Sequence, residues 1–157
     1  MKISYLTKRT HWWLWVYLFS ASCGRVDQLG ESRTRAFSAL RGALTETQIF
    51  MVEHGFSNST DFSDWVKSEL LSTNKTASVL RSVCDAVWVN RNVNDWIAST
   101  TNGHPTSMTA MVGNYRLGAE IHFVAISLDG RPVQQDGRPN DAGFFKVDLN
   151  LPRSLVH

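Results

Sequence analysis

The sequence lacks the features that would assign it to several large classes of protein. Its longest apolar run has only eight residues, which excludes a polytopic membrane protein, because each spanning helix needs about 20. Charged residues are scarce at 19%, against roughly 25% in typical soluble proteins. Hydrophobic residues nevertheless make up 43% of the 157, enough to fill a core, so the chain is not wholly disordered. The length suits one domain of the usual size, roughly 100–150 residues.

Motifs of the common catalytic sites are also missing. The chain has no glycine loop that would cradle a phosphate, no nucleophile elbow and no paired cysteines spaced for a metal. An enzyme is therefore unsupported, and a small secreted hydrolase or metal enzyme is kept as an alternative. It would use Cys84 as a thiol nucleophile, or Glu120 and His122 as metal ligands on one face of a strand. Glu53 and His54 are better explained by a helix end than by an acid/base pair.

What the sequence does contain is an N-terminus with three zones. Residues 1–11 carry three basic residues and no acidic one, residues 12–19 (WWLWVYLF) are all apolar, and small residues follow at 20–23. A basic start, a short apolar core and a small-residue exit are the physical requirements of a secretory signal peptide. We therefore predict a signal peptide at 1–22 and a single exported domain at 23–157. A buried, Trp-rich N-terminal helix is the alternative.

The residues before Cys23 suggest two routes of processing. Residues 19–23 (FSASC) resemble a bacterial lipoprotein box, whose cysteine is lipidated, although Ser20 stands where leucine is usual. The resemblance implies a lipid-anchored protein, whereas ordinary cleavage beside Ser22 implies a secreted or periplasmic one. If Cys23 stays free, a disulfide with Cys84 is available in an oxidising compartment. If Cys23 is lipidated, Cys84 is a lone core thiol.

The positive charge of the chain belongs to this N-terminal segment. The whole chain has 16 basic and 14 acidic residues, a formal charge of +2. Without residues 1–22, a domain of 135 residues remains with 13 basic and 14 acidic residues, a charge of −1. No cluster of Lys and Arg and no nucleic-acid motif is left in it. We therefore expect no nucleic-acid partner, and contact with a membrane only through the N-terminus.

The first half of the exported domain has helical periodicity. We predict a helix over 32–54, with an apolar stripe that includes Leu40 and Leu44 and a stop at Gly55. The N-cap residues at 57–61 predict a second helix, with Phe62, Trp65 and Val66 on its apolar face. Residues 77–89 favour a third helix, with a strand as the alternative because many of them are β-branched. Residues 90–104 are polar, with a loop at 99–103 and buried anchors at Val93, Trp96 and Ile97.

The second half changes to the period of two that is typical of strands. We predict strands at 107–112, 119–128 and 143–149, with a turn beginning at Gly113-Asn114. In the last strand, Phe145, Val147 and Leu149 should face opposite to Phe144, Lys146 and Asp148. Helices first and strands later imply an α+β fold, with two or three helices on an antiparallel sheet of three to four strands.

A four-residue repeat, Asp-Gly-Arg-Pro, lies between the last two predicted strands. It occurs at 129–132 and again at 136–139. Each copy should form a tight corner, because Asp bonds the backbone two residues on and Gly accepts positive φ. A connection as long as 129–142 is often functional, so it is the expected binding surface. Its candidate residues are Asp129, Arg131, Asp136, Arg138 and Asp141, of which the three aspartates could converge on Ca²⁺.

The order of elements resembles that of a type II secretion pseudopilin. The shared features are a long N-terminal helix, then an antiparallel sheet with an Asp-Gly loop near its C-terminal end. The resemblance implies an assembly subunit of a secretion or pilus system, in which such a loop can hold Ca²⁺ at Asp129, Asp136 and Asp141. The chain departs from the family at 12–19, which provide neither the longer apolar helix nor its characteristic Glu.

Together these features predict an exported envelope protein that has no catalytic role. We expect the domain to bind another envelope or secreted protein through loop 129–142 and the adjoining strand edge. The pseudopilin-like assembly subunit is the alternative.

Overall fold

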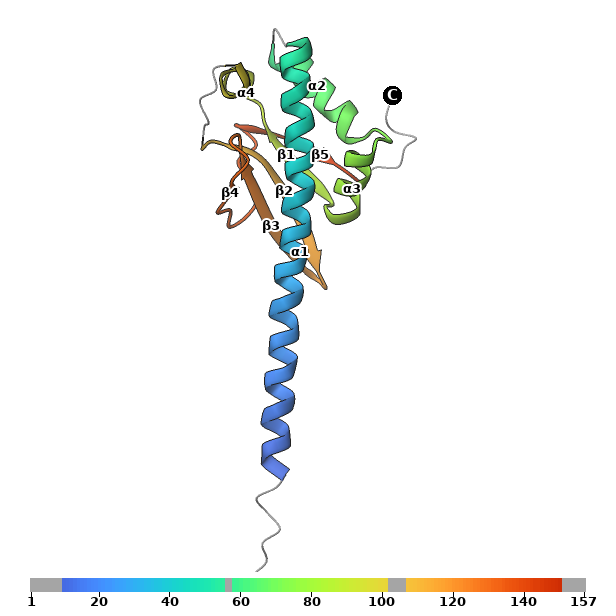
Figure 1. Cartoon of the computed structure of the whole chain (residues 1–157), viewed down its shortest axis with the longest axis vertical. Coiled ribbons are helices and arrows are strands. Elements are labelled where there is room, and N and C mark those ends of the chain that lie inside the picture. The colour runs from blue at the N-terminus through green and yellow to red at the C-terminus, as the bar shows by residue number, and fades with distance from the viewer. Residues whose placement is uncertain (1–9, 56–57, 102–106, 151–157) are drawn as a thin grey trace, which may run out of the picture. The chain divides into compact units, whose positions relative to one another are not determined.

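The computed structural model describes residues 10–55, 58–101 and 107–150, with the backbone alone for 10–26. The chain divides into two compact units, Met1–Glu31 and Ser32–His157, and each is described by itself. Helix α1 (Thr10–His54) has residues in both units (Figure 1). The predicted signal peptide lies partly outside the described residues, and its remaining part, 10–22, lies in α1. Within the described part of the chain, no helix is both long and apolar enough to cross a membrane.

The helix predicted over 32–54 is the C-terminal part of α1, which begins earlier, at Thr10. Residues 10–54 contain no proline, and the stretch therefore holds none of the residues that most strongly break a helix. The predicted stop is confirmed: Gly55 has φ +66°, and its amide donates to the Met51 carbonyl at 3.1 Å. The buried stripe of α1 in the second unit is formed by Ala36, Ala39, Leu40, Ala43, Leu44, Thr47 and Met51.

Two short helices follow, α2 (Ser59–Leu70) and α3 (Lys75–Val83). Each begins at an asparagine N-cap, whose side-chain oxygen accepts a backbone N–H of the first turn. Asn58 Oδ1 accepts from the Asp61 amide at 2.9 Å, and Asn74 Oδ1 accepts from the Ala77 amide at 2.7 Å. The caps explain why both helices begin where they do.

Five strands form one antiparallel sheet in the order β4-β3-β2-β1-β5 (Figure 1). They are β1 (Ala86–Asn90), β2 (Thr109–Leu117), β3 (Glu120–Ser127), β4 (Pro132–Val133) and β5 (Phe144–Asp148). The described residues thus hold four helices and five strands, which confirms the α+β class with more elements than predicted.

The prediction of one helix over 77–89 is wrong in its second half. Helix α3 ends at Val83, and β1 follows as a central strand between β2 and β5. All five residues of β1 are buried, so the sequence shows no alternation that would have marked a strand. The β-branched Val87 and Val89, which flank Trp88, favour the extended conformation once neighbouring strands are present.

The segment 90–104 is also more regular than predicted. Helix α4 (Val93–Thr101) takes up part of the predicted loop at 99–103. Of the three expected anchors, Val93 and Trp96 are buried and Ile97 is half-buried. Trp96 Nε1 donates to the Asn90 carbonyl at 2.9 Å. Thr100 and Thr101 donate their hydroxyls to carbonyls three or four residues earlier, which lets a threonine-rich end remain helical.

The turn predicted at Gly113-Asn114 does not exist, because both residues lie in the middle of β2. The chain turns at Gly118, which has φ +62°. Gly113 is needed for close packing: a Cβ there would lie 3.0 Å from Cys84 Sγ and 3.3 Å from Leu40 Cδ1. A glycine that looked like a turn signal therefore marks a close contact between α1 and the sheet.

The two faces of the sheet have different surroundings. On the covered face, Gln48 of α1 donates to the Leu128 carbonyl at 2.7 Å, and Phe62 of α2 lies 6.4 Å from Phe145 of β5 between ring centroids. Residues 32–54 of α1 lie across the strands on this side (Figure 1). The opposite, open face carries a small cluster formed by Ala86, Trp88, Val112 and Ala125, with Phe123, Val133 and Phe144 against it.

Candidate functional site

The first copy of the Asp-Gly-Arg-Pro repeat forms the predicted corner. Gly130 has φ +77°, and its amide donates to the Ser127 carbonyl at 2.9 Å. Asp129 accepts the Ser127 hydroxyl and, at 3.4 Å, the Arg131 amide. The hydrogen bond from Ser127 lowers the pKa of Asp129, with help from Arg131. Asp129 is thus engaged in holding the turn.

The second copy does not form the same corner. Gly137 has no positive φ, contrary to the prediction, and its carbonyl accepts from Gln135 Nε2 at 2.6 Å. Arg138 pairs with Asp141, and this hydrogen bond lowers the pKa of Asp141. Equal sequence therefore produces two different local structures, because the first copy forms the turn between the paired strands β3 and β4, whereas the second lies in a loop outside the sheet.

Arg91, which follows β1, binds the C-terminal end of the connection 129–142 through its guanidinium group. Its Nη2 donates to the Asp141 carbonyl at 3.0 Å and to the Phe144 carbonyl at 2.6 Å. Pro139 is buried, whereas Arg131 and Asp136 point to solvent. Arg131 Nε lies 3.6 Å from Asp129 Oδ2, and 82% of the arginine side chain is accessible. The loop thus presents charged side chains on a fixed backbone.

Two of the three aspartates that were predicted to hold Ca²⁺ have separate partners, and the third, Asp136, is exposed. Asp129 bonds Ser127, and Asp141 bonds Arg138. Over residues 27–55, 58–101 and 107–150, no group of three His, Cys, Asp or Glu side chains is arranged to hold a metal. The calcium site stays a prediction, which thermal melting in millimolar calcium tests, since a ligand bound only by the folded state raises Tm.

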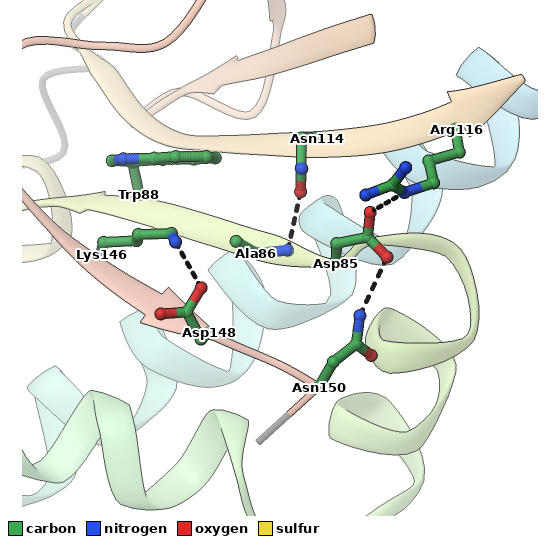
Figure 2. Close-up of a pocket in the computed structure, with 8 residues that line it drawn as sticks. All are labelled: Asp85, Ala86, Trp88, Asn114, Arg116, Lys146, Asp148 and Asn150. Atoms are coloured by element: carbon green, nitrogen blue, oxygen red, sulfur yellow. Dashed lines mark hydrogen bonds and ion pairs between the residues drawn. The ribbon is translucent and has the colours of Figure 1, made fainter. Parts of the chain in front are cut away.

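A hollow on the open face was not predicted from the sequence. It has a volume of about 400 Å³ and is lined by Asp85, Ala86, Trp88, Asn114, Arg116, Lys146, Asp148 and Asn150 (Figure 2). Asp85 accepts from Arg116 Nε at 2.6 Å and from Asn150 Nδ2 at 2.9 Å. Lys146 pairs with Asp148 on the neighbouring side. The two cations and two carboxylates neutralise each other, so the hollow suits a polar, uncharged contact better than an ion.

Trp88 forms part of the wall of this hollow. Its side chain is 4% exposed, and Lys146 Nζ lies 5.8 Å from its ring centroid. Trp88 Nε1 is buried and has no hydrogen-bond partner within the described residues. Like Trp88, the predicted anchor Trp96 is buried. Trp65 is half-buried and stacks on Phe50 at 3.8 Å between centroids.

The residues of the hollow are spread from 85 to 150 in the sequence, and only strand pairing brings them together. Ala86 pairs with Asn114 on one side and with Asp148 on the other. The predicted alternation of β5, with Lys146 and Asp148 on the opposite side from Phe145 and Val147, was the one available signal. The alternation is confirmed, but it does not reveal which residues lie beside β5.

Glu120 and His122 lie on the same side of β3, as predicted. His122 Nε2 is 3.4 Å from Glu120 Oε2, and its ring stacks on Tyr115 at 5.5 Å between centroids. Burial raises the pKa of Tyr115, and the charge of Arg33 opposes the shift. In the described part of the chain no third metal ligand joins them. The pair therefore offers no metal centre there.

The geometry does not support an enzyme that uses Cys84 as a thiol nucleophile. Cys84 is a free, buried cysteine, and burial, with a smaller effect from Asp85, raises its pKa to about 12. A thiol nucleophile needs the opposite shift. For Cys23 only the backbone, within α1, is described.

Glu53 and His54 lie at the end of α1, as predicted. His54 stacks on Phe50 at 4.0 Å between centroids, in the last turn, where a helix favours a positive charge. The prediction of a structural role fits this packing.

Comparison of the chain with protein-family models, with curated proteins and with solved structures finds no match.

Proposed function

We propose that this chain is an exported envelope protein whose folded domain binds another envelope or secreted protein and has no catalytic role. The observation that carries the proposal is the rigid presentation of loop 129–142. Arg91 donates to the carbonyls of Asp141 and Phe144 at the C-terminal end of the loop, and the side chain of Arg138 pairs with that of Asp141. Arg131 and Asp136 are exposed. The hydrogen-bonded backbone means that little conformational entropy is lost when a partner binds.

The alternative proposal is a pseudopilin-like assembly subunit. It is supported by α1, a 45-residue helix whose C-terminal part provides the buried stripe beneath an antiparallel sheet. The corresponding resemblance in sequence was the order of a long N-terminal helix, a sheet and an Asp-Gly loop. In this form the N-terminal part of α1 would connect the domain to an assembly, and loop 129–142 would contact a neighbouring subunit.

The loop interface is tested by removing its exposed charges. We expect the double variant Arg131→Ala/Asp136→Ala to keep its fold and to weaken recovery of a cross-linked envelope partner about tenfold, equal to 1.4 kcal/mol. The matched control is Glu53→Ala/Lys75→Ala, which removes one charge of each sign from exposed positions elsewhere. Equal recovery by wild type and both variants would contradict the proposal.

Export is tested separately by mass spectrometry of the mature N-terminus. Lipidated Cys23 and an unmodified N-terminus near residue 23 both agree with export, and they distinguish the anchored from the secreted form. An intact chain recovered from the cytoplasm would contradict export and restore the Trp-rich N-terminal helix as the better interpretation of residues 12–19.

A further inference from the structure

The hollow on the open face is separate from the loop that the proposed function uses. None of its eight lining residues belongs to 129–142 (Figure 2). Its volume of about 400 Å³ lies within the range of about 300–1,000 Å³ that is usual for small-molecule sites. The hollow is therefore large enough to hold a small ligand of its own.

The charged side chains of the hollow neutralise each other in pairs. Arg116 pairs with Asp85, and Lys146 pairs with Asp148. A charged ligand would therefore meet a like charge next to each opposite one. Between 32% and 58% of each of these four side chains is accessible, so a ligand can reach them without opening the fold. The charge pattern favours a ligand that is polar and neutral.

The polar groups of the hollow keep donors and acceptors that no described residue uses. Arg116 donates to Asp85 through Nε, which leaves the two Nη groups of its guanidinium. Asn114 accepts the Ala86 amide with Oδ1 and keeps the N–H groups of Nδ2, although the residue is only 8% accessible. Asn150 donates Nδ2 to Asp85 and keeps Oδ1 as an acceptor. Unused donors and unused acceptors therefore lie close together.

Hydroxyl groups match such a mixed set, because each hydroxyl donates one hydrogen bond and accepts two at a single atom. An amide, by contrast, divides its donor and its acceptor between two atoms that point in different directions. Two hydroxyls on neighbouring carbons also match the paired N–H groups of a guanidinium, which are fixed in one plane. The hydrogen-bonding pattern thus favours a compound with several neighbouring hydroxyls.

The β3 side of the hollow is apolar. Strand register places Ile121 beside Arg116 and Phe123 beside Asn114, on the same face of the sheet. Ile121 is 49% accessible, and Phe123 is half-buried. A sugar ring carries C–H groups on its faces and hydroxyls around its edge. A ring that packs on these side chains can therefore direct its hydroxyls to the polar groups of β2.

We propose that the hollow binds a neutral sugar, whose ring packs on Phe123 and whose neighbouring hydroxyls bond to the unused N–H groups of Arg116 and Asn114. Asn150 Oδ1 accepts a hydroxyl proton on the far side. The inference goes beyond the proposed function and uses none of the candidate residues of loop 129–142. The sugar is either free or one unit of a glycan chain, which share this chemistry.

The binding is tested by NMR titration of the isotope-labelled full chain with glucose, maltose, cellobiose and N,N′-diacetylchitobiose at millimolar concentrations. At least one of these probes should shift the backbone amides of Asn114 and Arg116 in a saturable way. Glucose 6-phosphate and glucosamine, which add a charge of one sign to glucose, should bind no better than glucose. A disaccharide that binds more tightly than glucose identifies a glycan chain as the ligand, and equal binding identifies a free sugar.

The role of the guanidinium is tested by Arg116→Ala, which should raise the Kd of the best probe at least about tenfold. Arg116→Lys keeps the charge but lacks the planar pair of donors, so it should bind as weakly as the alanine variant. The matched control Arg41→Ala removes an exposed arginine of α1 and should bind as wild type. Thermal melting establishes that each variant is folded.

Several results would overturn the proposal. They are the absence of a saturable shift with all four neutral sugars, shifts confined to residues outside the hollow, and tighter binding of either charged probe. Wild-type affinity in Arg116→Ala or in Arg116→Lys would do the same, because the planar donors would then not hold the sugar. Loss of binding in Arg41→Ala would also overturn it, since the effect would not be specific to the hollow.

Discussion

The two faces of the sheet are made by alternate residues of the same strands, and both bury apolar side chains, but the open face also has a hollow lined by charged groups. On the covered face, Val87, Val124 and Val147 are buried beneath helices. On the open face, Asn114, Arg116 and Lys146 surround a hollow and form hydrogen bonds and ion pairs with their neighbours. The covered face packs against helices, whereas the open face carries polar and charged groups around the hollow. The following predictions compare how much each face of the sheet contributes to the free energy of unfolding.

The largest effect is expected on the covered face, at Phe62. This side chain is fully buried and packs against Trp96 and Phe145. Truncation to alanine removes buried area and leaves a cavity, so Phe62→Ala should lower the free energy of unfolding by about 3–5 kcal/mol. Phe144→Ala, on the open face beside Phe145, should cost much less. Equal losses in urea unfolding would mean that the two faces contribute similarly.

A smaller loss is expected at Gly113, where the covered face is most tightly packed. A Cβ there would come within 3.0 Å of Cys84 Sγ. Gly113→Ala should therefore cost about 1–3 kcal/mol through overpacking, measured by urea unfolding. Gly137→Ala is the control, because nothing lies within 4 Å of its added Cβ and its φ is not positive. A neutral Gly113→Ala would show that α1 can move away from the sheet.

The buried thiol beside Gly113 predicts a loss of stability in alkali. Burial raises the pKa of Cys84 from 9.0 to about 12, so the folded chain keeps a proton that the unfolded chain loses. Stability is complete below pH 9 and is lost as pH rises towards 12, by up to about 1.4 kcal/mol per pH unit. Denaturation at several pH values should show a shallower decline for Cys84→Ala. Identical pH profiles would mean that solvent reaches this thiol in the folded state.

On the open face, the largest single effect is expected at Asn114. Its side-chain oxygen accepts the Ala86 amide at 2.7 Å in a buried position. Asn114→Leu leaves that N–H without a partner and should cost at least about 1 kcal/mol. Asn114→Asp keeps an acceptor oxygen and should restore part of the loss. If leucine is as stable as the wild type, the open face contributes nothing to folding at this position.

The smallest effect is expected for the ion pair at the rim of the hollow. Arg116 Nε lies 2.6 Å from Asp85 Oδ2, but 58% of the arginine side chain is accessible. Exposed pairs contribute at most about 1 kcal/mol, and salt screens them. A double-mutant cycle with Arg116→Ala and Asp85→Ala should give a coupling within that limit. A larger coupling would mean that the open face is as important for folding as the covered one.

The parts of the fold that depend on interactions between neighbouring residues were predictable from the sequence. Gly55 ends α1, an asparagine within the predicted N-cap cluster begins α2, and alternation marks β5, as the sequence indicated. The errors have a common cause. Strand β1 is buried on both sides and shows no alternation, and Gly113 serves the packing of Leu40, which no local pattern reveals.

The candidate site divides in the same way. The corner at Gly130 was predictable from its own residues, because the Asp129 side chain and the glycine φ are local properties. The difference between the two repeats was not, since it depends on whether the neighbouring residues join a strand. The hollow was not predictable either. Its residues are spread from 85 to 150 in the sequence, and they lie together only because β1 pairs with β2 and β5.

By itself, the sequence determined the α+β class, the helix caps and stops, and the inward side of β5, because each depends on contacts within a few residues. Tertiary structure alone decided which strands are neighbours and which face of the sheet residues 32–54 of α1 cover. Those features arise from long-range pairing, in which every strand competes for the same buried surface. The physical reason is that local conformation is encoded by neighbouring residues, whereas an edge or a hollow exists only once distant segments have packed.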